Sequence, residues 1–374
     1  MQYVTPRDGL LKIVANLRSL GYTVVAPTLR DGAVCLSPVE SANEIAKGVV
    51  DSQEPGKYRA KMAGDGYFSA VNGPTSAKKY LHPGRVDLFK AKLGPDGPEF
   101  FSTFRKESKL AIMGLRPCDL KAVYVQDRVL LQGPYKDPVY ASLRADALLI
   151  VVNCTRAGSN CFCASMGTGP KAVDGFDLAI TELSDRFVLH VPGERPAFLD
   201  GLELAPASEE DLREEEAAIE KVKATMGKRI EHPAPAEAVY ESLESPVWEE
   251  VSQRCLACGN CTMVCPTCFC TSVKDATDLV DGSVTRVREW DSCMSRSFTY
   301  SHGYNPRYGR KARYRQFVMH KFAYWTEQFG AYGCVGCGRC ITWCPVGIDI
   351  AETVNAIVKS VGDKRTLPEV VKVA

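Results

Sequence analysis

The sequence has no apolar run long enough to cross a bilayer. Its longest apolar stretch covers residues 147–152, whereas a membrane helix needs about 20 such residues, and the first residues do not read as a secretory signal peptide. Charge of one sign is also missing, because 46 Lys and Arg residues face 45 Asp and Glu residues. A net charge of +1 gives no general attraction to nucleic acid or a membrane surface. We therefore expect a globular protein of the cytoplasm.

Nucleotide-binding motifs are missing as well. No G-x-G-x-x-G pattern follows a predicted strand, and no Walker A pattern exists. Gly167-Thr-Gly-Pro170 is only weakly similar to a phosphate- or flavin-binding turn, and Gly and Pro together more often form a simple turn. The five His residues are scattered, and none pairs with a carboxylate at metal-ligand spacing. We expect no catalytic residue in this chain.

Cysteine, in contrast, is abundant and unevenly placed. The chain has 16 cysteines in 374 residues, and 11 of them fall between Cys255 and Cys344. In a reducing compartment, clustered thiols are metal ligands or redox groups more often than disulfides. The sequence therefore indicates a metal or redox protein.

Periodicity predicts an α+β protein with an N-terminal α/β domain over residues 1–205. Short apolar segments rich in Val and Ile indicate buried strands, and helical spacing follows two other segments. The predicted strands are 22–27, 66–71, 110–115, 147–152 and 177–183, and the predicted helices are 7–20 and 117–131. Residues 206–247 read as a charged, exposed helix starting near Ser208, followed by a Pro-containing linker. Residues 248–374 read as a bacterial-ferredoxin-like domain that ends in a helix over 349–362 and a short tail.

One motif occurs twice, with its copies 79 residues apart. Both copies have the pattern C-x2-C-x2-C-x3-C-P, which binds 4Fe-4S clusters in two-cluster ferredoxins, where the fourth Cys of each copy ligates the other cluster. On that rule the first cluster takes Cys255, Cys258, Cys261 and Cys344, and the second takes Cys334, Cys337, Cys340 and Cys265. A zinc ribbon uses two C-x2-C pairs and needs no third Cys at the same step. We therefore predict two 4Fe-4S clusters that pass electrons one at a time.

A basic insertion of 68 residues separates the two copies. Three interpretations are open: cationic side chains that raise the cluster potentials, a solvated surface, or a docking face for an acidic partner. Between Arg286 and Lys321 only Glu289 and Asp291 oppose the basic residues, which are Arg286, Arg288, Arg296, Arg307, Arg310, Lys311, Arg313, Arg315 and Lys321.

Four further cysteines lie in the N-terminal domain at predicted strand ends or helix starts. Cys118 and Cys154 each follow a buried strand, and ligands of α/β sheets gather beyond the carboxyl ends of strands. Together with Cys161 and Cys163 they could hold a third 4Fe-4S cluster, although free Cys is also a common buried residue. Cys35 reads as part of a strand core.

Cys268, Cys270 and Cys293 have no place in these three sets. Because Cys161-Phe-Cys163 and Cys268-Phe-Cys270 are alike, one alternative is a cluster shared between the domains and built from both pairs. Another is a separate cluster that uses Cys268, Cys270 and Cys293 with His302.

Seven segments of the chain together resemble one known family. They are Asp51-Ser-Gln-Glu-Pro-Gly-Lys-Tyr-Arg59, Asn72-Gly-Pro-Thr-Ser-Ala-Lys-Lys79, Arg116-Pro-Cys-Asp-Leu-Lys121, Cys161-Phe-Cys-Ala-Ser-Met-Gly-Thr-Gly-Pro170, Cys265-Pro-Thr-Cys-Phe-Cys270, Trp290-Asp-Ser-Cys293 and Gly333-Cys-Val-Gly-Cys-Gly-Arg-Cys340. With these segments the chain resembles the beta (iron–sulfur) subunits of cytoplasmic NiFe hydrogenases of the NADP-linked sulfhydrogenase type. The resemblance covers about residues 51–352, and the corresponding subunit of anaerobic sulfite reductase is a close relative with a similar architecture.

The resemblance implies a non-catalytic relay subunit. It would carry electrons between a flavin subunit with a 2Fe-2S centre, which binds FAD and NAD(P)H, and the small and large NiFe subunits. Two alternatives stay open: the equivalent relay of an anaerobic sulfite reductase, and a self-contained oxidoreductase whose α/β domain binds its own flavin.

Overall fold

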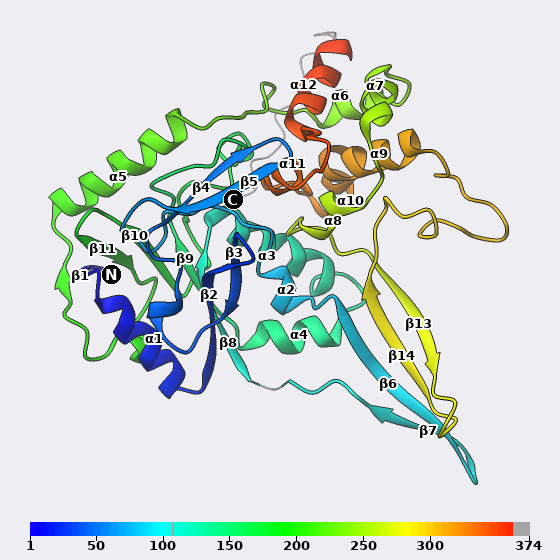
Figure 1. Cartoon of the computed structure of the whole chain (residues 1–374), viewed down its shortest axis with the longest axis horizontal. Coiled ribbons are helices and arrows are strands. Elements are labelled where there is room, and N and C mark those ends of the chain that lie inside the picture. The colour runs from blue at the N-terminus through cyan, green and yellow to red at the C-terminus, as the bar shows by residue number, and fades with distance from the viewer. Residues whose placement is uncertain (107, 362–374) are drawn as a thin grey trace.

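The computed structural model describes residues 1–106 and 108–361. This part of the chain contains an eight-stranded sheet, a two-stranded sheet of β4 and β5, a projecting four-stranded sheet, and a mainly helical region with the repeated cysteine motifs (Figure 1). The strands are β1 (Gln2–Pro6), β2 (Tyr22–Arg30), β3 (Ala33–Pro38), β4 (Val49–Glu54), β5 (Lys57–Met62), β6 (Arg85–Gly94), β7 (Gly97–Ser102), β8 (Lys109–Leu115), β9 (Leu148–Val152), β10 (Leu178–Glu182), β11 (Arg186–His190), β12 (Ala205–Pro206), β13 (Thr271–Thr277) and β14 (Val284–Trp290). The helices are α1 (Gly9–Ser19), α2 (Lys78–Leu81), α3 (Pro117–Leu130), α4 (Pro138–Ala145), α5 (Glu209–Ala224), α6 (Ala236–Glu241), α7 (Val247–Arg254), α8 (Asn260–Met263), α9 (Arg310–Met319), α10 (Trp325–Phe329), α11 (Arg339–Thr342) and α12 (Ile350–Val361), with short helical segments η1 (Ala42–Glu44), η2 (Ala197–Leu199) and η3 (His320–Tyr324).

The large sheet has the order β12-β1-β11-β10-β9-β8-β2-β3 and is covered on both faces. Its central strands β10, β9, β8 and β2 are parallel, and the outer pairs are antiparallel. In β8, Ala111 and Met113 pack in the core that contains α1, whereas Leu110 and Ile112 pack in the core that contains α3 and α4. A strand buried on both faces must be apolar throughout, which is why these strands read as uninterrupted Val and Ile runs.

The structure confirms an α+β protein, and it contains four of the five strands and both helices predicted in the N-terminal region. The prediction of a strand at residues 66–71 is wrong. Distant side chains satisfy this backbone in place of a ladder: the Glu182 carboxylate accepts from the amides of Tyr67 and Phe68, each at 2.8 Å. Arg116 donates to the carbonyl oxygens of Phe68 and Ala70.

The charged helix expected after residue 206 is α5, and Ser208 caps it by accepting from the amide of Asp211 at 3.2 Å. The following segment contains α6, whose Val239 is buried in a second hydrophobic core with Trp248 and Phe322. The helix predicted over 349–362 is α12, although Gly362 and the tail lie outside the described residues.

The projecting sheet combines two segments that are distant in sequence. Its order is β13-β14-β6-β7, so half of it comes from the N-terminal region and half from the insertion between the cysteine motifs. Figure 1 shows the two hairpins extending together from the body of the molecule. The insertion therefore connects the N-terminal region to the cysteine motifs.

Candidate metal centre

The two cysteine loops have the same local conformation. The amide of Ala257 donates to Cys255 Sγ at 3.3 Å, and the amide of Gly336, at the same place in the second copy, donates to Cys334 Sγ at 3.5 Å. Both donor residues have a positive φ, +52° and +64°. Each loop then passes through a left-handed glycine and starts a short helix, α8 or α11. The repeat in sequence is therefore a repeat in structure.

The first group of thiols surrounds a cavity. Cys255, Cys258, Cys261 and Cys344 all line it, with Tyr314, Phe317 and other apolar side chains completing the walls. Burial raises the pKa of the Cys261 thiol well above its usual value, and the thiols of Cys293, Cys255, Cys344 and Cys258 raise it further. The last cysteine of the second motif thus joins the first three of the first motif.

The second group is formed reciprocally. Burial raises the pKa of the Cys334 thiol to about 12, although Lys321 opposes this shift, and the nearby Cys337 and Cys265 thiols add to it. Burial also raises the pKa of the Cys340 thiol well above its usual value. The thiols of Cys334, Cys337 and Cys265, and that of Cys261 in the first group, raise it further. The two groups are therefore neighbours.

Lys321 lies beside the second group, in the π-helical segment η3. Its ammonium group donates to Cys265 Sγ at 3.1 Å, Thr267 Oγ1 at 3.1 Å and Gly333 O at 3.0 Å. The neighbouring Cys268 thiol, followed by the Lys321 charge, lowers the pKa of the Cys265 thiol well below its usual value. A buried cation thus favours the thiolate form that a metal needs.

A third group lies in the N-terminal region. Cys118 is in the first turn of α3, just after β8, and Cys154 follows β9. Burial raises the pKa of the Cys163 thiol well above its usual value, and Cys161, Cys154 and Cys337 raise it further. Burial has the same effect on Cys118, which Asp119, Cys163 and Cys337 strengthen. The four predicted residues therefore lie together, next to Cys337 of the second group.

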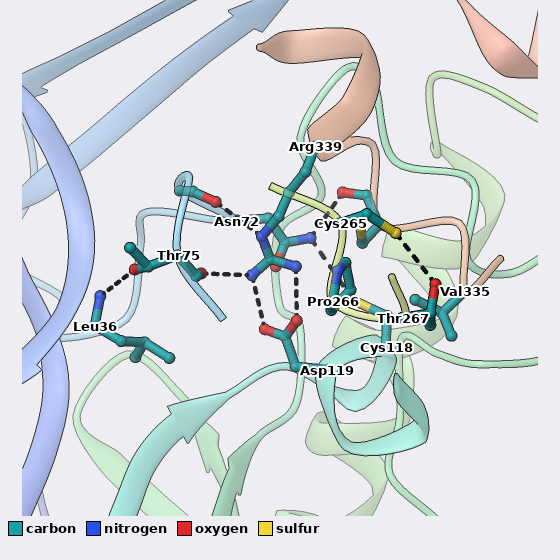
Figure 2. A network of polar contacts seen from close by, with 12 residues as sticks. Leu36, Asn72, Thr75, Cys118, Asp119, Cys265, Pro266, Thr267, Val335 and Arg339 are labelled. Carbon is teal, nitrogen blue, oxygen red and sulfur yellow. Dashed lines mark hydrogen bonds and ion pairs between the residues drawn. The ribbon is translucent and has the colours of Figure 1, made fainter. Parts of the chain in front are cut away.

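A buried ion pair fixes the third group against the second. Arg339, which precedes Cys340, donates to both carboxylate oxygens of Asp119 at 2.6 and 2.9 Å and to the carbonyl oxygens of Gly73 and Thr75 (Figure 2). Both side chains are almost completely buried. A buried pair of this kind holds position more than it adds stability, because both charges lose their hydration.

Asn72 makes a second link between these groups. Its amide nitrogen donates to Cys337 O at 3.0 Å and lies 3.7 Å from Cys118 Sγ. Phe162 N also donates to Gly336 O at 2.8 Å, so the loop between Cys161 and Cys163 packs on the second ferredoxin loop. The sequence alone assigned no role to Asn72, Lys78, Asp119 or Arg339. All four lie in the segments that carry the family resemblance, and the last two stand directly beside cysteines.

The remaining cysteines separate into different surroundings. The Cys265 thiol raises the pKa of Cys268, and burial followed by the Cys270 thiol raises the pKa of Cys293 to about 12, so the second Cys-Phe-Cys segment has cysteine neighbours that are not in the first. A cluster shared between the two segments stays a prediction. His302 is exposed on a turn with a positive φ, and Cys35 is half-buried in β3 and not in a core.

No single interpretation covers the nine basic residues predicted in the insertion. Four of them form ion pairs with carboxylates, namely Arg286, Arg288, Lys311 and Arg315. Arg286 pairs with Asp275 on the projecting sheet at 2.7 Å, and Arg288 pairs with Asp137. Arg310 donates to Cys255 O at 3.1 Å. Of the predicted cationic set, Lys321 is the member that touches a cysteine sulfur.

These groups fit iron–sulfur clusters better than single ions. Zinc holds its ligands about 2.0–2.3 Å away, and among residues 1–361 without residue 107 no three Cys, His, Asp or Glu side chains are placed to hold one ion. A cubane needs thiolates farther apart, around a body with apolar surroundings and amide donors to sulfur. The cavity between Cys255, Cys258, Cys261 and Cys344 has that form.

The comparisons with known proteins agree with this chemistry. Residues 254–348 match the family model described as a 4Fe-4S dicluster domain. The sulfhydrogenase 2 subunit beta of Pyrococcus furiosus is 32% identical over 255 residues, which cover 67% of this chain and 75% of that protein. No solved structure matches the chain. None of the helices in the described part has the length and apolar character of a membrane span. The chain is an iron–sulfur protein with an electron-transfer role, and it belongs to the family of sulfhydrogenase beta subunits.

Proposed function

We propose that this chain relays single electrons between a flavin subunit that binds FAD and NAD(P)H and the NiFe subunits of a hydrogenase. Three thiol groups hold the 4Fe-4S clusters of the relay. The first site is Cys255, Cys258, Cys261 and Cys344, the second is Cys265, Cys334, Cys337 and Cys340, and the third is Cys118, Cys154, Cys161 and Cys163.

The continuity of these groups is the observation that carries the proposal. Burial raises the pKa of these thiols, and thiols of the neighbouring group raise it further. Cys261 of the first group raises the pKa of Cys340 in the second. Cys337 of the second group raises the pKa of Cys118, Cys161 and Cys163 in the third. Clusters with four thiolate ligands take up and release one electron at a time and need no open coordination position. A line of adjacent sites is what a relay requires.

The residues around the sites favour transfer over chemistry on a substrate. All of the proposed ligands except Cys258 are buried or half-buried, and apolar side chains close their surroundings. The amides of Ala257, Gly336 and Ile348 point at cysteine sulfurs. Amide donors and low solvent exposure set cluster potentials. The buried pair of Arg339 and Asp119 keeps the second and third sites in fixed register.

Anaerobic affinity purification of the chain from its native host, with mass spectrometry and metal analysis of the complex, tests the assignment. We expect nickel to co-elute with a flavin subunit and with a large NiFe subunit. A co-eluting sirohaem protein would assign the relay to sulfite reduction, and a flavin absorbance band in the isolated chain would replace the relay with a self-contained oxidoreductase.

A further inference from the structure

Three cysteines outside the proposed relay sites gather at the base of the projecting sheet. Cys270 directly precedes β13, Cys268 lies two residues before Cys270, and Cys293 comes three residues after the end of β14. The first pair of the hairpin register joins Thr271 and Trp290, and the amide of Asp291 donates to Cys270 O at 2.9 Å. The hairpin therefore closes with these cysteines on both of its arms.

The three thiols lie between the first two relay sites. Cys293 is buried and is the first of the thiols that raise the pKa of Cys261. The Cys265 thiol of the second site raises the pKa of the Cys268 thiol well above its usual value, which places the two side chains next to each other. Burial raises the pKa of the Cys293 thiol to about 12, and the nearby Cys270 thiol contributes to this shift. Cys270 therefore lies close to Cys293.

Two buried lysines face this group. Lys78 and Lys321 are only 6% and 4% exposed, and the acidic groups that act most strongly on both are thiols of cysteine. Burial lowers the pKa of both lysines, and the thiols of Cys265 and Cys268 raise it. The Cys270 thiol also raises the pKa of Lys78. Burying an ammonium group is costly unless an anion compensates it.

Cys265 is committed to the second site and can compensate one cation in part. Lys78 donates to the carbonyl oxygens of Thr262 and Met263 at 3.3 and 3.1 Å, and its ammonium lies 4.0 Å from the centre of the Trp290 ring. These contacts supply partial charge only. Lys321 already faces the second site, whose cluster can compensate its charge. The surroundings of Lys78 therefore call for a further anionic group at the three spare thiols.

We propose that Cys268, Cys270 and Cys293 bind a fourth iron–sulfur cluster, with Lys78 and Lys321 compensating its negative charge. The proposal deepens the relay function and rests on it. The three thiols lose their protons to solvent when the iron binds. Zinc and a Cys270–Cys293 disulfide are the competing fates of these thiols, and the spacing of the described residues gives no site for one ion.

Iron counting on the full chain, isolated anaerobically after reconstitution with iron and sulfide, tests the fourth site. Three relay clusters contain about 12 iron atoms, and a fourth cluster raises the count to about 15 or 16. We expect Cys293→Ser and Cys270→Ser each to lose about three or four iron atoms, with one cluster signal missing from the EPR spectrum of the reduced protein. Cys35→Ser is the matched control, because this thiol lies in β3, and it should keep every iron atom and every signal.

The proposal is overturned if both variants hold as much iron as Cys35→Ser, or if zinc or a disulfide accounts for the spare thiols. If either variant fails to fold, the iron content of the unmodified chain decides. About 12 iron atoms per chain overturn the proposal, and about 15 or 16 support it. The relay function fails separately, through clusters that dithionite does not reduce. Cys118→Ser removes a different cluster, so its loss of iron should add to that of Cys293→Ser.

Discussion

Replacing Lys321 with methionine should lower the reduction potential of the second cluster. The substitution keeps an unbranched side chain that is one atom shorter, and it removes a buried positive charge 3.1 Å from Cys265 Sγ. Reduction adds one negative charge to the cluster, and a nearby cation stabilises that state. Without Lys321 the cluster is harder to reduce.

The size of the shift follows from the same distance. Two unit charges 3.1 Å apart interact by about 5 kcal/mol at an effective dielectric constant of about 20. The added electron spreads over the whole cluster, so we expect about half of this interaction, roughly 2.5 kcal/mol. Because about 1.4 kcal/mol corresponds to about 59 mV in a one-electron couple, the potential should fall by about 100 mV.

An EPR-monitored redox titration of the full chain measures this shift, with iron content checked first to show that the variant is loaded. The matched control is Lys274→Met, whose side chain is exposed on β13. Solvent and salt screen an exposed charge, so the control should shift by less than about 20 mV. A fully loaded Lys321→Met chain with an unchanged or raised potential would refute the electrostatic role of Lys321.

Three further substitutions test the framework around the sites. Arg339→Met leaves Asp119 buried without its partner, so the free energy of unfolding in anaerobic denaturant titration should fall by about 3–5 kcal/mol; a loss below about 1 kcal/mol would contradict the buried pair. Gly336→Ala places a methyl group 2.6 Å from a backbone nitrogen of the third site at a φ of +64°, so iron content should fall, whereas Gly309→Ala, with open space around it, should keep all its iron. Ser208→Ala removes a helix cap and should cost about 1 kcal/mol in the same titration; an unchanged midpoint would exclude the cap.

The ferredoxin core could be predicted because its information is local. The spacing of Cys255, Cys258 and Cys261 fixes one loop, the second copy repeats it, and the exchange of fourth cysteines follows a rule of the motif. The central strands were equally readable, since burial on both faces demands continuous apolar segments.

Long-range polar contacts explain what the sequence did not reveal. Residues 66–71 are apolar like a strand, yet Glu182 and Arg116 take up their backbone groups. Nothing near Lys78 in sequence indicates that it meets cysteines almost two hundred residues later. Similarly, the pairing of β6 with β14 joins segments that periodicity treats as unrelated.

The most direct test of the relay is Cys340→Ser in the purified hydrogenase complex. EPR should show the second cluster missing, since this residue is one of its four proposed ligands. Electron flow from NADPH should then stop, while activity with an artificial dye at the distant redox centre should survive. NADPH-coupled activity that persists without the second cluster would contradict the account.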